Sequence, residues 1–324
     1  MQNYSFFQKL LHKFFFNIKL INLLLYELEK FFFINKVYNY NNYKHIFITG
    51  LPRSGTTPLL NCIFKSEMFA SLTYENMPYL FAPNISLAIN VSENFEKKIR
   101  FHNDQIYFDL KSPEAFDQPF LNLTKNNLNE FSNYVNLILH SKKKERYLSK
   151  NNKNYIRISE LKKIFPNAIF LIPIRYPINH SNSLFNQHKN FSSLQKKDKF
   201  ILDYMNFLDH HEFGLNHKEW FKPIKYTNYN ELNYWLEQWY LFYNNIYDKF
   251  INQKNVHILI YENLFDDFYR SKITNSLDLK NINLDLENKN INLKNLDIDN
   301  DLKLKSINLY NKFLNSNHFN TNYS

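Results

Sequence analysis

The sequence predicts an α/β fold in which a central parallel sheet is flanked by helices. Three observations support this prediction. Runs of β-branched and aromatic residues alternate along the chain with segments of helical periodicity. Two of only three glycines, Gly50 and Gly55, bracket a tight loop that joins one such run to the start of a helix. The chain has 324 residues, of which 44% are hydrophobic, and this suffices for one large core or two modest domains.

The composition narrows the function classes. The formal charge of +10 comes from lysines spread along the chain, without the dense block or the module that is typical of nucleic-acid binding. We therefore expect no nucleic acid as a partner, and a basic surface that suits an anionic ligand. The single cysteine, Cys62, permits no internal disulfide and no cysteine-based metal site, which favours a reducing, cytoplasmic compartment.

Residues 6–34 are rich in aromatic and aliphatic side chains, but charged residues interrupt them. No uncharged run is long enough for a transmembrane helix, and no small-residue cleavage site follows. Two interpretations stay open. The segment is either a helix packed on the rest of the protein or a basic amphipathic helix that rests on the inner membrane surface. We assign residues 1–40 to an N-terminal helical segment.

The stretch around the first two glycines predicts an anion site. Residues 45–49 have the side chains of a buried strand, and the glycines permit sharp turns and a close approach to a ligand. Thr56, Thr57 and Pro58 suit the first turn of a helix, where proline loses no hydrogen bond. The unpaired backbone N–H groups at this helix start, together with Arg53, would hold an anionic group.

Further strands and helices are expected along the chain. The expected strands or extended pieces are residues 70–78, 146–152, 168–174 and 256–264, and the expected helices are 59–64, 128–139, 156–165, the segment after Pro177, 232–250 and 299–314. Residues 190–230 are interpreted as an insertion or lid, and residues 276–301 as loosely ordered. The alternation of strands and helices implies right-handed parallel crossovers.

Positive and hydroxyl-bearing side chains follow three of the expected strands. These are Arg53 in the first loop, Lys150 at the end of a strand, and Arg175 with Ser183 after the next. The carboxyl ends of parallel strands share one edge of the sheet, so several anionic groups could be held there together. The loop is similar to a Walker A loop, but Thr56 stands at the lysine position, which argues against an ordinary Mg·ATP site.

At this point the residues carry a resemblance to a family. The run Gly50, Leu51, Pro52, Arg53, Ser54, Gly55, Thr56 and Thr57 resembles the 5′-phosphosulfate loop of sulfotransferases, which use 3′-phosphoadenosine 5′-phosphosulfate (PAPS). Arg175, Pro177 and Ser183, which lies eight residues after the arginine, are similar to that family's 3′-phosphate motif. Residues 165–168 and 261–264 also look like the family, so the likeness spans residues 45–265, patchily between 80 and 145.

The resemblance implies a P-loop NTPase-like, three-layer fold. It places a sulfotransferase α/β domain at residues 41–270, followed by an Asn- and Lys-rich extension at 271–324 with a final helix. The C-terminal Gly-rich nucleotide motif of cytosolic sulfotransferases is absent, because Gly214 is the only glycine beyond Gly55. The chain therefore looks closer to the bacterial and Golgi-like families, with a partial likeness to tyrosylprotein sulfotransferases.

The resemblance also implies roles for the site residues. The residues of the loop (Gly50, Pro52, Arg53, Ser54, Gly55, Thr56 and Thr57) would bind the 5′-phosphosulfate, and Arg53 would also stabilise the leaving phosphate. Arg175 and Ser183 would hold the 3′-phosphate, with Gln187 nearby. Lys150 looks like the lysine that neutralises the transferring sulfonate. No metal is needed in this scheme.

The general base is expected to be Glu75, which lies 22 residues after Arg53, much as the catalytic glutamate follows the loop in tyrosylprotein sulfotransferases. His188 is the rival base, since cytosolic sulfotransferases use histidine. We expect the acceptor to be a hydroxyl-bearing carbohydrate or glycolipid. A P-loop kinase that uses ATP and a catalytically silent nucleotide-binding protein are the alternatives. The sequence indicates no oligomeric state.

Overall fold

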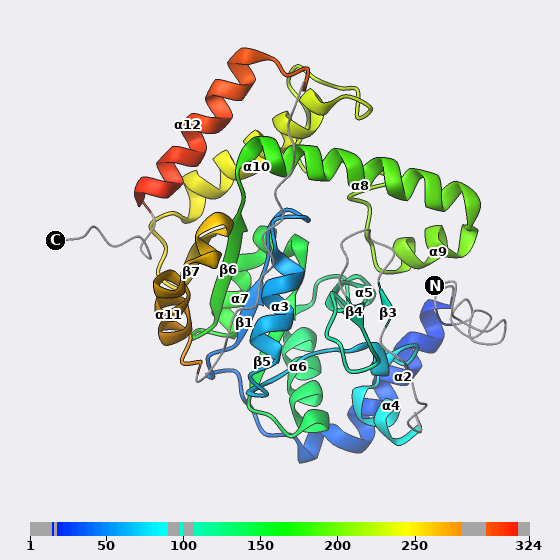
Figure 1. Cartoon of the computed structure of the whole chain (residues 1–324). Coiled ribbons are helices and arrows are strands. Elements are labelled where there is room, and N and C mark those ends of the chain that lie inside the picture. The colour runs from blue at the N-terminus through cyan, green and yellow to red at the C-terminus, as the bar shows by residue number, and fades with distance from the viewer. Residues whose placement is uncertain (1–14, 16–17, 90–97, 100–106, 280–295, 317–324) are drawn as a thin grey trace.

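The computed structural model describes residues 15, 18–89, 98–99, 107–279 and 296–316. Within these residues, five strands form one parallel sheet flanked by helices (Figure 1). Their order across the sheet is β2 (Phe69–Ala70), β5 (Arg146–Lys150), β1 (Ile46–Ile48), β6 (Ile169–Ile174) and β7 (Val256–Ile260). The predicted α/β fold with a central parallel sheet is thereby confirmed.

Strand β1 occupies the middle of the sheet. The chain leaves β1 for the edge strand β2, returns to β5 beside β1, and then crosses to β6 on the other side of β1. Ile48, the last residue of β1, lies in register with Lys150 on one side and Leu171 on the other. The loop after β1 therefore lies at the point where the strand order reverses, which is where open α/β sheets bind ligands.

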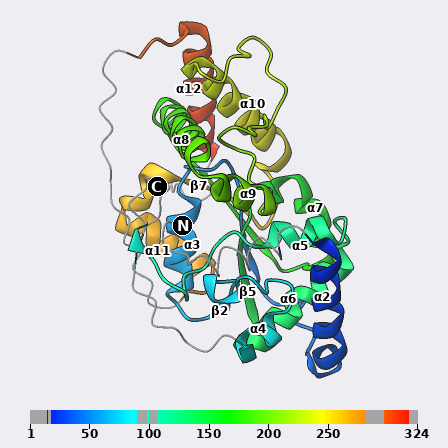
Figure 2. The same ribbon diagram turned by 90° about the vertical axis from the view of Figure 1, so that its right-hand side faces the viewer.

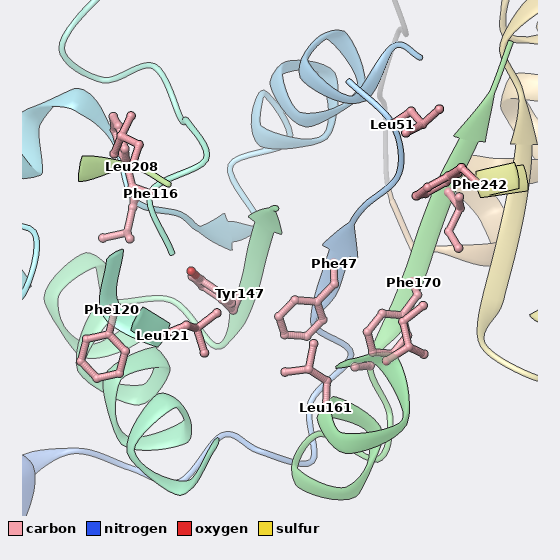
Figure 3. Packing of buried hydrophobic residues seen from close by; sticks show 14 of the residues in the cluster. Phe47, Leu51, Phe116, Phe120, Leu121, Tyr147, Leu161, Phe170, Leu208 and Phe242 are labelled. Atoms are coloured by element: carbon pink, nitrogen blue, oxygen red, sulfur yellow. The ribbon is translucent and has the colours of Figure 1, made fainter. Parts of the chain in front are cut away.

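Alternate side chains of the strands face two helical layers. Ile46 and Ile48 of β1 lie in one cluster with residues of α3 (Thr56–Phe64) and α11 (Asp267–Ser276). Phe47 points to the opposite face, which is covered by α6 (Leu128–Lys142), α7 (Ile158–Ile164) and α10 (Leu232–Phe250). There its ring stacks on Phe170 of β6 at 5.4 Å between centroids (Figure 3). The period of two in a strand makes these β-branched and aromatic runs fill both cores.

Helix α8 (Pro177–Lys197) runs across the edge of the sheet where β6 ends (Figure 1). Pro177 at its start fixes a helical φ at a position where no N–H is needed. Residues 190–230, which were interpreted as an insertion or lid, begin with the last part of α8, which continues to Lys197, and α9 (Lys199–Phe207) follows at once. Irregular backbone follows α9 and ends on α10, where Glu237 accepts the N–H groups of residues 224–226.

Several expected elements are shorter than their sequence pattern. The extended piece at 70–78 pairs with β5 only through Phe69–Ala70, then turns into the 3₁₀ helix η2 (Tyr74–Asn76), which Thr73 and Asn76 cap reciprocally. The expected helix at 156–165 begins as the 3₁₀ helix η3 (Asn152–Arg157). The expected strand at 256–264 ends at Ile260 and continues as η4 (Tyr261–Phe265). In each case a cap or a turn at a strand end competes with the regular element.

The remaining described elements lie at the periphery. Helix α2 (Lys19–Phe33), followed by η1 (Ile34–Lys36), contacts α4 (Pro83–Ile89) and α5 (Asp117–Leu123) on the outside of the molecule (Figure 2). Strands β3 (Lys98–Ile99) and β4 (Tyr107–Phe108) form a separate antiparallel pair. Helix α12 (Asn300–Ser316) packs on α10.

Two sequence expectations concern parts of the chain that lie partly outside the described residues. Most of the stretch that was expected to be loosely ordered falls in 280–295, and residues 6–14 and 16–17 precede α2. Among the helices that the structure describes, none has both the length and the apolar character that crossing a bilayer requires.

Candidate functional site

The loop between β1 and α3 has the backbone conformation that its glycines predict. Gly50 and Gly55 have φ values of 130° and 102°, and Arg53 between them is also left-handed at 68°. A Cβ on Gly55 would lie 2.6 Å from the ring of Tyr261, so the position has neither the conformation nor the space for a side chain. Gly55 is the N-cap of α3, and the first N–H groups of that helix point back into the loop.

Hydrogen bonds inside the loop fix its shape. Ser54 is fully buried and its Oγ donates to the carbonyl of Leu51 at 2.7 Å, so this hydroxyl braces the loop from within. Thr56 and Thr57 lie in the first turn of α3 and are largely buried. The first helical hydrogen bond joins the N–H of Leu59 to the carbonyl of Gly55. The loop is therefore preorganised, with its helix start available to an anion.

The structure brings the two predicted phosphate motifs into direct contact. Arg53 Nε donates to Ser183 Oγ at 3.2 Å, although 130 residues separate them in the chain. Arg175 follows β6, and its guanidinium lies 5.2 Å from the centroid of the Tyr261 ring. That ring is the same one that covers Gly55. Two arginines, a helix start and a hydroxyl thus meet at one edge of the sheet.

His180 is a site residue that the sequence analysis missed. It is fully buried on α8, and its Nε2 lies 2.8 Å from the carbonyl of Pro52, which only accepts, so Nε2 carries the proton and donates. Burial lowers the pKa of His180 to about 3, and the charges of Arg175 and Arg53 act in the same direction. A neutral His180 therefore ties α8 to the loop. Its position one helical turn before Ser183 is the feature of the sequence that could have indicated it.

The residues after β7 form a second brace. Glu262 Oε1 accepts the N–H of Tyr176, the neighbour of Arg175, at 2.8 Å. Its Oε2 accepts the hydroxyl of Tyr310 on α12 at 2.7 Å. The run at 261–264, which resembled the family, thus positions the backbone beside Arg175 while Tyr261 covers Gly55.

Lys150 lies where the sequence placed it, at the end of β5 beside β1. The next two residues continue this contact with β1: the N–H of Asn151 donates to the carbonyl of Ile48, and Thr49 Oγ1 donates to the carbonyl of Asn152. Lys150 Nζ lies 3.4 Å from Glu114 Oε1, and the two side chains are only 9% and 6% exposed. Glu114 is the second residue of this region that the sequence analysis did not identify.

Glu75 lies in η2 and pairs with another lysine. Its Oε2 accepts from Lys142 Nζ at 2.9 Å, and both side chains are partly exposed. Lys142 is the last residue of α6, shortly before β5 begins. The assignment of Glu75 as the general base stays a prediction.

His188 is buried in an aromatic cluster on α8. Its Nδ1 accepts the N–H of Gly214 at 3.3 Å, and its ring lies 5.2–5.3 Å from the rings of His217, Tyr229 and Trp235. Burial lowers the pKa of His188 to about 4, and His217 adds to this effect. These contacts tie the segment after α9 to α8, and Gln187 beside it is buried as well.

The described part of the chain contains no group of three or more His, Cys, Asp or Glu side chains that could hold a metal ion. Three cationic side chains lie at this edge of the sheet: Arg53, Arg175 and, beside β1, Lys150, which pairs with Glu114. Such a site can bind an anion with two separated charged groups and can stabilise negative charge that grows on a leaving oxygen.

Comparisons with known proteins give a match to one family. A model of the sulfotransferase family matches residues 45–271. Among curated proteins, none matches the chain. The structure is similar to a sulfotransferase from Mycobacterium tuberculosis, with 15% identity over 83% of this chain and 76% of that chain at a TM-score of 0.46. It is also similar to a sulfotransferase from Mycobacterium avium, with 12% identity over 90% of this chain and 71% of that chain at a TM-score of 0.42. A sulfotransferase from Alicyclobacillus acidocaldarius is similar with 11% identity over 85% of this chain and 94% of that chain at a TM-score of 0.40.

Proposed function

Because the chain belongs to the sulfotransferase family, we propose that it transfers a sulfonate group from PAPS to a hydroxyl group of an acceptor. The observation that carries the proposal is the contact between Arg53 of the loop and Ser183 of α8, at 3.2 Å. It joins the two motifs that would hold the two charged ends of this donor. At Gly55 the ring of Tyr261 leaves no space for a Cβ, and α3 begins directly after this residue. The exposed backbone N–H groups there would form a cradle for a phosphate.

The donor would be held at two ends. The N–H groups of the loop, Arg53 and the hydroxyls of Thr56 and Thr57 would bind the 5′-phosphosulfate, and Arg175 with Ser183 would bind the 3′-phosphate. His180 and Glu262 would act through the backbone, because each fixes a neighbour of these arginines. The mechanism gives no role to a metal ion.

The reaction would be an in-line displacement at sulfur. The acceptor oxygen attacks sulfur, and the bond between sulfur and the bridging oxygen breaks, with its electron pair on the departing phosphate. Arg53 and the start of α3 would stabilise this growing charge, since preorganised donors there need no reorientation. A general base takes the proton of the acceptor hydroxyl. From the sequence this base is assigned to Glu75, and Glu75→Gln tests that assignment: transfer at the full rate would remove Glu75 from the role.

The acceptor would be a carbohydrate or a glycolipid. The segment after α9 reaches η3, next to Lys150, through polar contacts: Lys153 pairs with Asp209 at 2.6 Å, and Asn152 Nδ2 approaches Glu212 Oε1 at 3.4 Å. Amide, carboxylate and ammonium groups are suited to a ligand with many hydroxyls.

The first prediction tests the donor. Adenosine 3′,5′-bisphosphate (PAP), the product of the donor, should bind in calorimetry without Mg²⁺, and Arg53→Ala should weaken it by about 10- to 100-fold because a charge-assisted contact is lost. Lys303→Ala, which removes an exposed cation on α12, is the control and should bind as the wild type does. Tight Mg·ATP binding with no response to PAP would favour the kinase alternative. PAP binding without any sulfonate transfer would favour the silent binding protein.

We also propose that α2 contacts an anionic membrane surface. Leu20, Leu24, Leu28 and Phe31 form one row on this helix and are 65%, 54%, 48% and 77% exposed. The sequence before Glu27 contains three lysines and no Asp or Glu. An apolar row next to a segment with only cationic charges is suited to an anionic bilayer. The single cysteine favours a reducing compartment, so we assign this contact to the inner, cytoplasmic membrane surface.

A further inference from the structure

A nearly buried ion pair lies beside the loop between β1 and α3, and its carboxylate, Glu114, has no role in the assignments above. Glu114 and Lys150 are 6% and 9% exposed at the side chain, and Lys150 Nζ lies 3.4 Å from Glu114 Oε1. Removing two charges from water is costly, and a pair of apolar side chains often stabilises a fold as well or better. A pair of this kind at a ligand edge is therefore a candidate for function.

The position of Lys150 on the sheet points it toward the loop. Along β5, Leu148 faces the layer of α3, where it lies in one cluster with Leu59 and Leu60. Because side chains alternate along a strand, Lys150 leaves the sheet on the same face. Helix α3 begins at Thr56 on that face, directly after the loop. The ammonium group of Lys150 and the start of α3 thus lie on the same face of the sheet, at its carboxyl edge.

Glu114 is held in place by contacts from three sides. The hydroxyl of Tyr74 donates to Oε2 at 3.1 Å, and the N–H of Ala115 donates to Oε1 at 2.9 Å. The N–H of Glu114 itself donates to the carbonyl of Leu72, which follows β2. The carboxylate is therefore oriented, with Oε1 shared between Lys150 and a backbone N–H. The pair that contains Glu75 is more exposed and is formed with the end of α6.

We infer that Glu114, oriented by Tyr74 and paired with Lys150, is the general base of the transfer in place of Glu75. This inference rests on the proposed function. In the resting protein Lys150 neutralises the carboxylate. When PAPS binds, the ammonium group turns to the sulfonate oxygens, and Oε1 accepts the proton of the acceptor hydroxyl as its oxygen bonds to sulfur. The electron pair of the broken bond leaves with the phosphate, and the proton ends on Glu114.

The first test compares two isosteric variants, Glu114→Gln and Glu75→Gln, with the exposed Glu160→Gln as control. The readouts are PAP affinity by calorimetry, and transfer of labelled sulfonate from PAPS to octyl glucoside and to water. We expect Glu114→Gln to bind PAP normally and to lose about 100- to 10,000-fold in transfer, the usual range for a general base. Formate added to Glu114→Ala should restore part of the rate, which a structural role would not allow. Transfer by Glu114→Gln within about threefold of the wild type overturns the inference.

The second test follows Lys150 without turnover. If its ammonium group moves to the sulfonate, Lys150→Met should weaken PAPS about tenfold or more and leave PAP, which has no sulfonate, unchanged. If the ratio of PAPS affinity to PAP affinity is the same in Lys150→Met and in the wild type, the movement of the Lys150 ammonium group to the sulfonate is refuted. The two proposals fail differently: a wild type that binds neither PAP nor PAPS refutes the proposed function, whereas normal binding with full transfer in Glu114→Gln refutes only this inference.

Discussion

At the scale of single residues, the site depends on side chains that hold backbone as much as on those that would hold a ligand. Ser54 braces the loop from within, and His180 holds the carbonyl of Pro52 at 2.8 Å. Neither contact is visible in a motif, because each joins a side chain to a carbonyl whose position depends on the fold. Arg53 and Arg175 are then presented from fixed backbone, which lowers the entropy lost on binding.

His180 should make stability depend on pH. Its pKa is lowered to about 3 in the folded protein, by burial first, from an ordinary value near 6.5. Between these values the unfolded chain binds a proton that the folded chain does not, so stability is lost as the pH falls from about 6.5 toward 3. In His180→Gln, the amide can still donate to the carbonyl of Pro52. As the pH is lowered, the free energy of unfolding of this variant should fall less steeply than that of the wild type, and the two slopes should differ by up to about 1.4 kcal/mol per pH unit. Urea titrations at several pH values measure this slope. Parallel curves for variant and wild type would contradict the prediction.

At the scale of elements, helices that surround the sheet differ in what they contribute. Helix α8 supplies both His180 and Ser183 to the loop, and its length carries it across the carboxyl edge. Helix α2 supplies Tyr26 and Glu29 to the interior, where Glu29 accepts the N–H groups that begin α4. Its other face keeps the exposed apolar row.

That row predicts binding to anionic vesicles. Replacing Leu24 and Phe31 together with Gln should lower co-sedimentation with phosphatidylcholine–phosphatidylserine vesicles by about tenfold or more, since both side chains lose the gain from entering the bilayer. Leu304→Gln is the matched control, because Leu304 is an exposed leucine on α12. Vesicles of phosphatidylcholine alone should bind the wild type less well. Equal binding of the double variant and the wild type would refute the membrane contact.

At the scale of the whole molecule, the C-terminal helix is connected to the site. Helix α12 packs on α10, and Tyr310 reaches Glu262, which in turn holds the N–H of Tyr176 beside Arg175. Segments from the loop near residue 50 to the end of α12 therefore meet at one edge of the sheet. A ligand bound there would stabilise the molecule as a unit.

Tyr310→Phe tests this connection. Loss of its hydrogen bond to Glu262 should lower the free energy of unfolding by about 1–2 kcal/mol and weaken PAP by a few fold, because the backbone at Tyr176 is less firmly held. Tyr247→Phe is the control, since Tyr247 packs on Phe313 of the same helix. Thermal unfolding with and without PAP measures both effects. An unchanged PAP affinity at reduced stability would limit the role of α12 to folding.

Local pattern determined the strands, most helices and the loop between β1 and α3. Strand β6 and helix α10 follow from hydrophobic periodicity, and the loop follows from two glycines with φ values that few other residues adopt. The parallel sheet and its shared edge followed from the alternation of strands and helices. These features are encoded within windows of some ten to twenty residues, so the sequence by itself contained them.

The tertiary structure alone decided which side chains meet. Lys150 was predicted at the edge, but its partner Glu114 stands 36 residues earlier, in a stretch without clear periodicity, and Glu75 pairs with Lys142. Likewise, no sequence motif marks His180, and its contact with Pro52 arises only because α8 lies beside the loop in the folded protein. Contacts between distant segments depend on strand order and on how irregular connections turn, and neither leaves a local periodic signal. The sequence therefore determined the loop with its two glycines and helix start, and the fold decided that the carboxylate of Glu114 pairs with Lys150 beside β1.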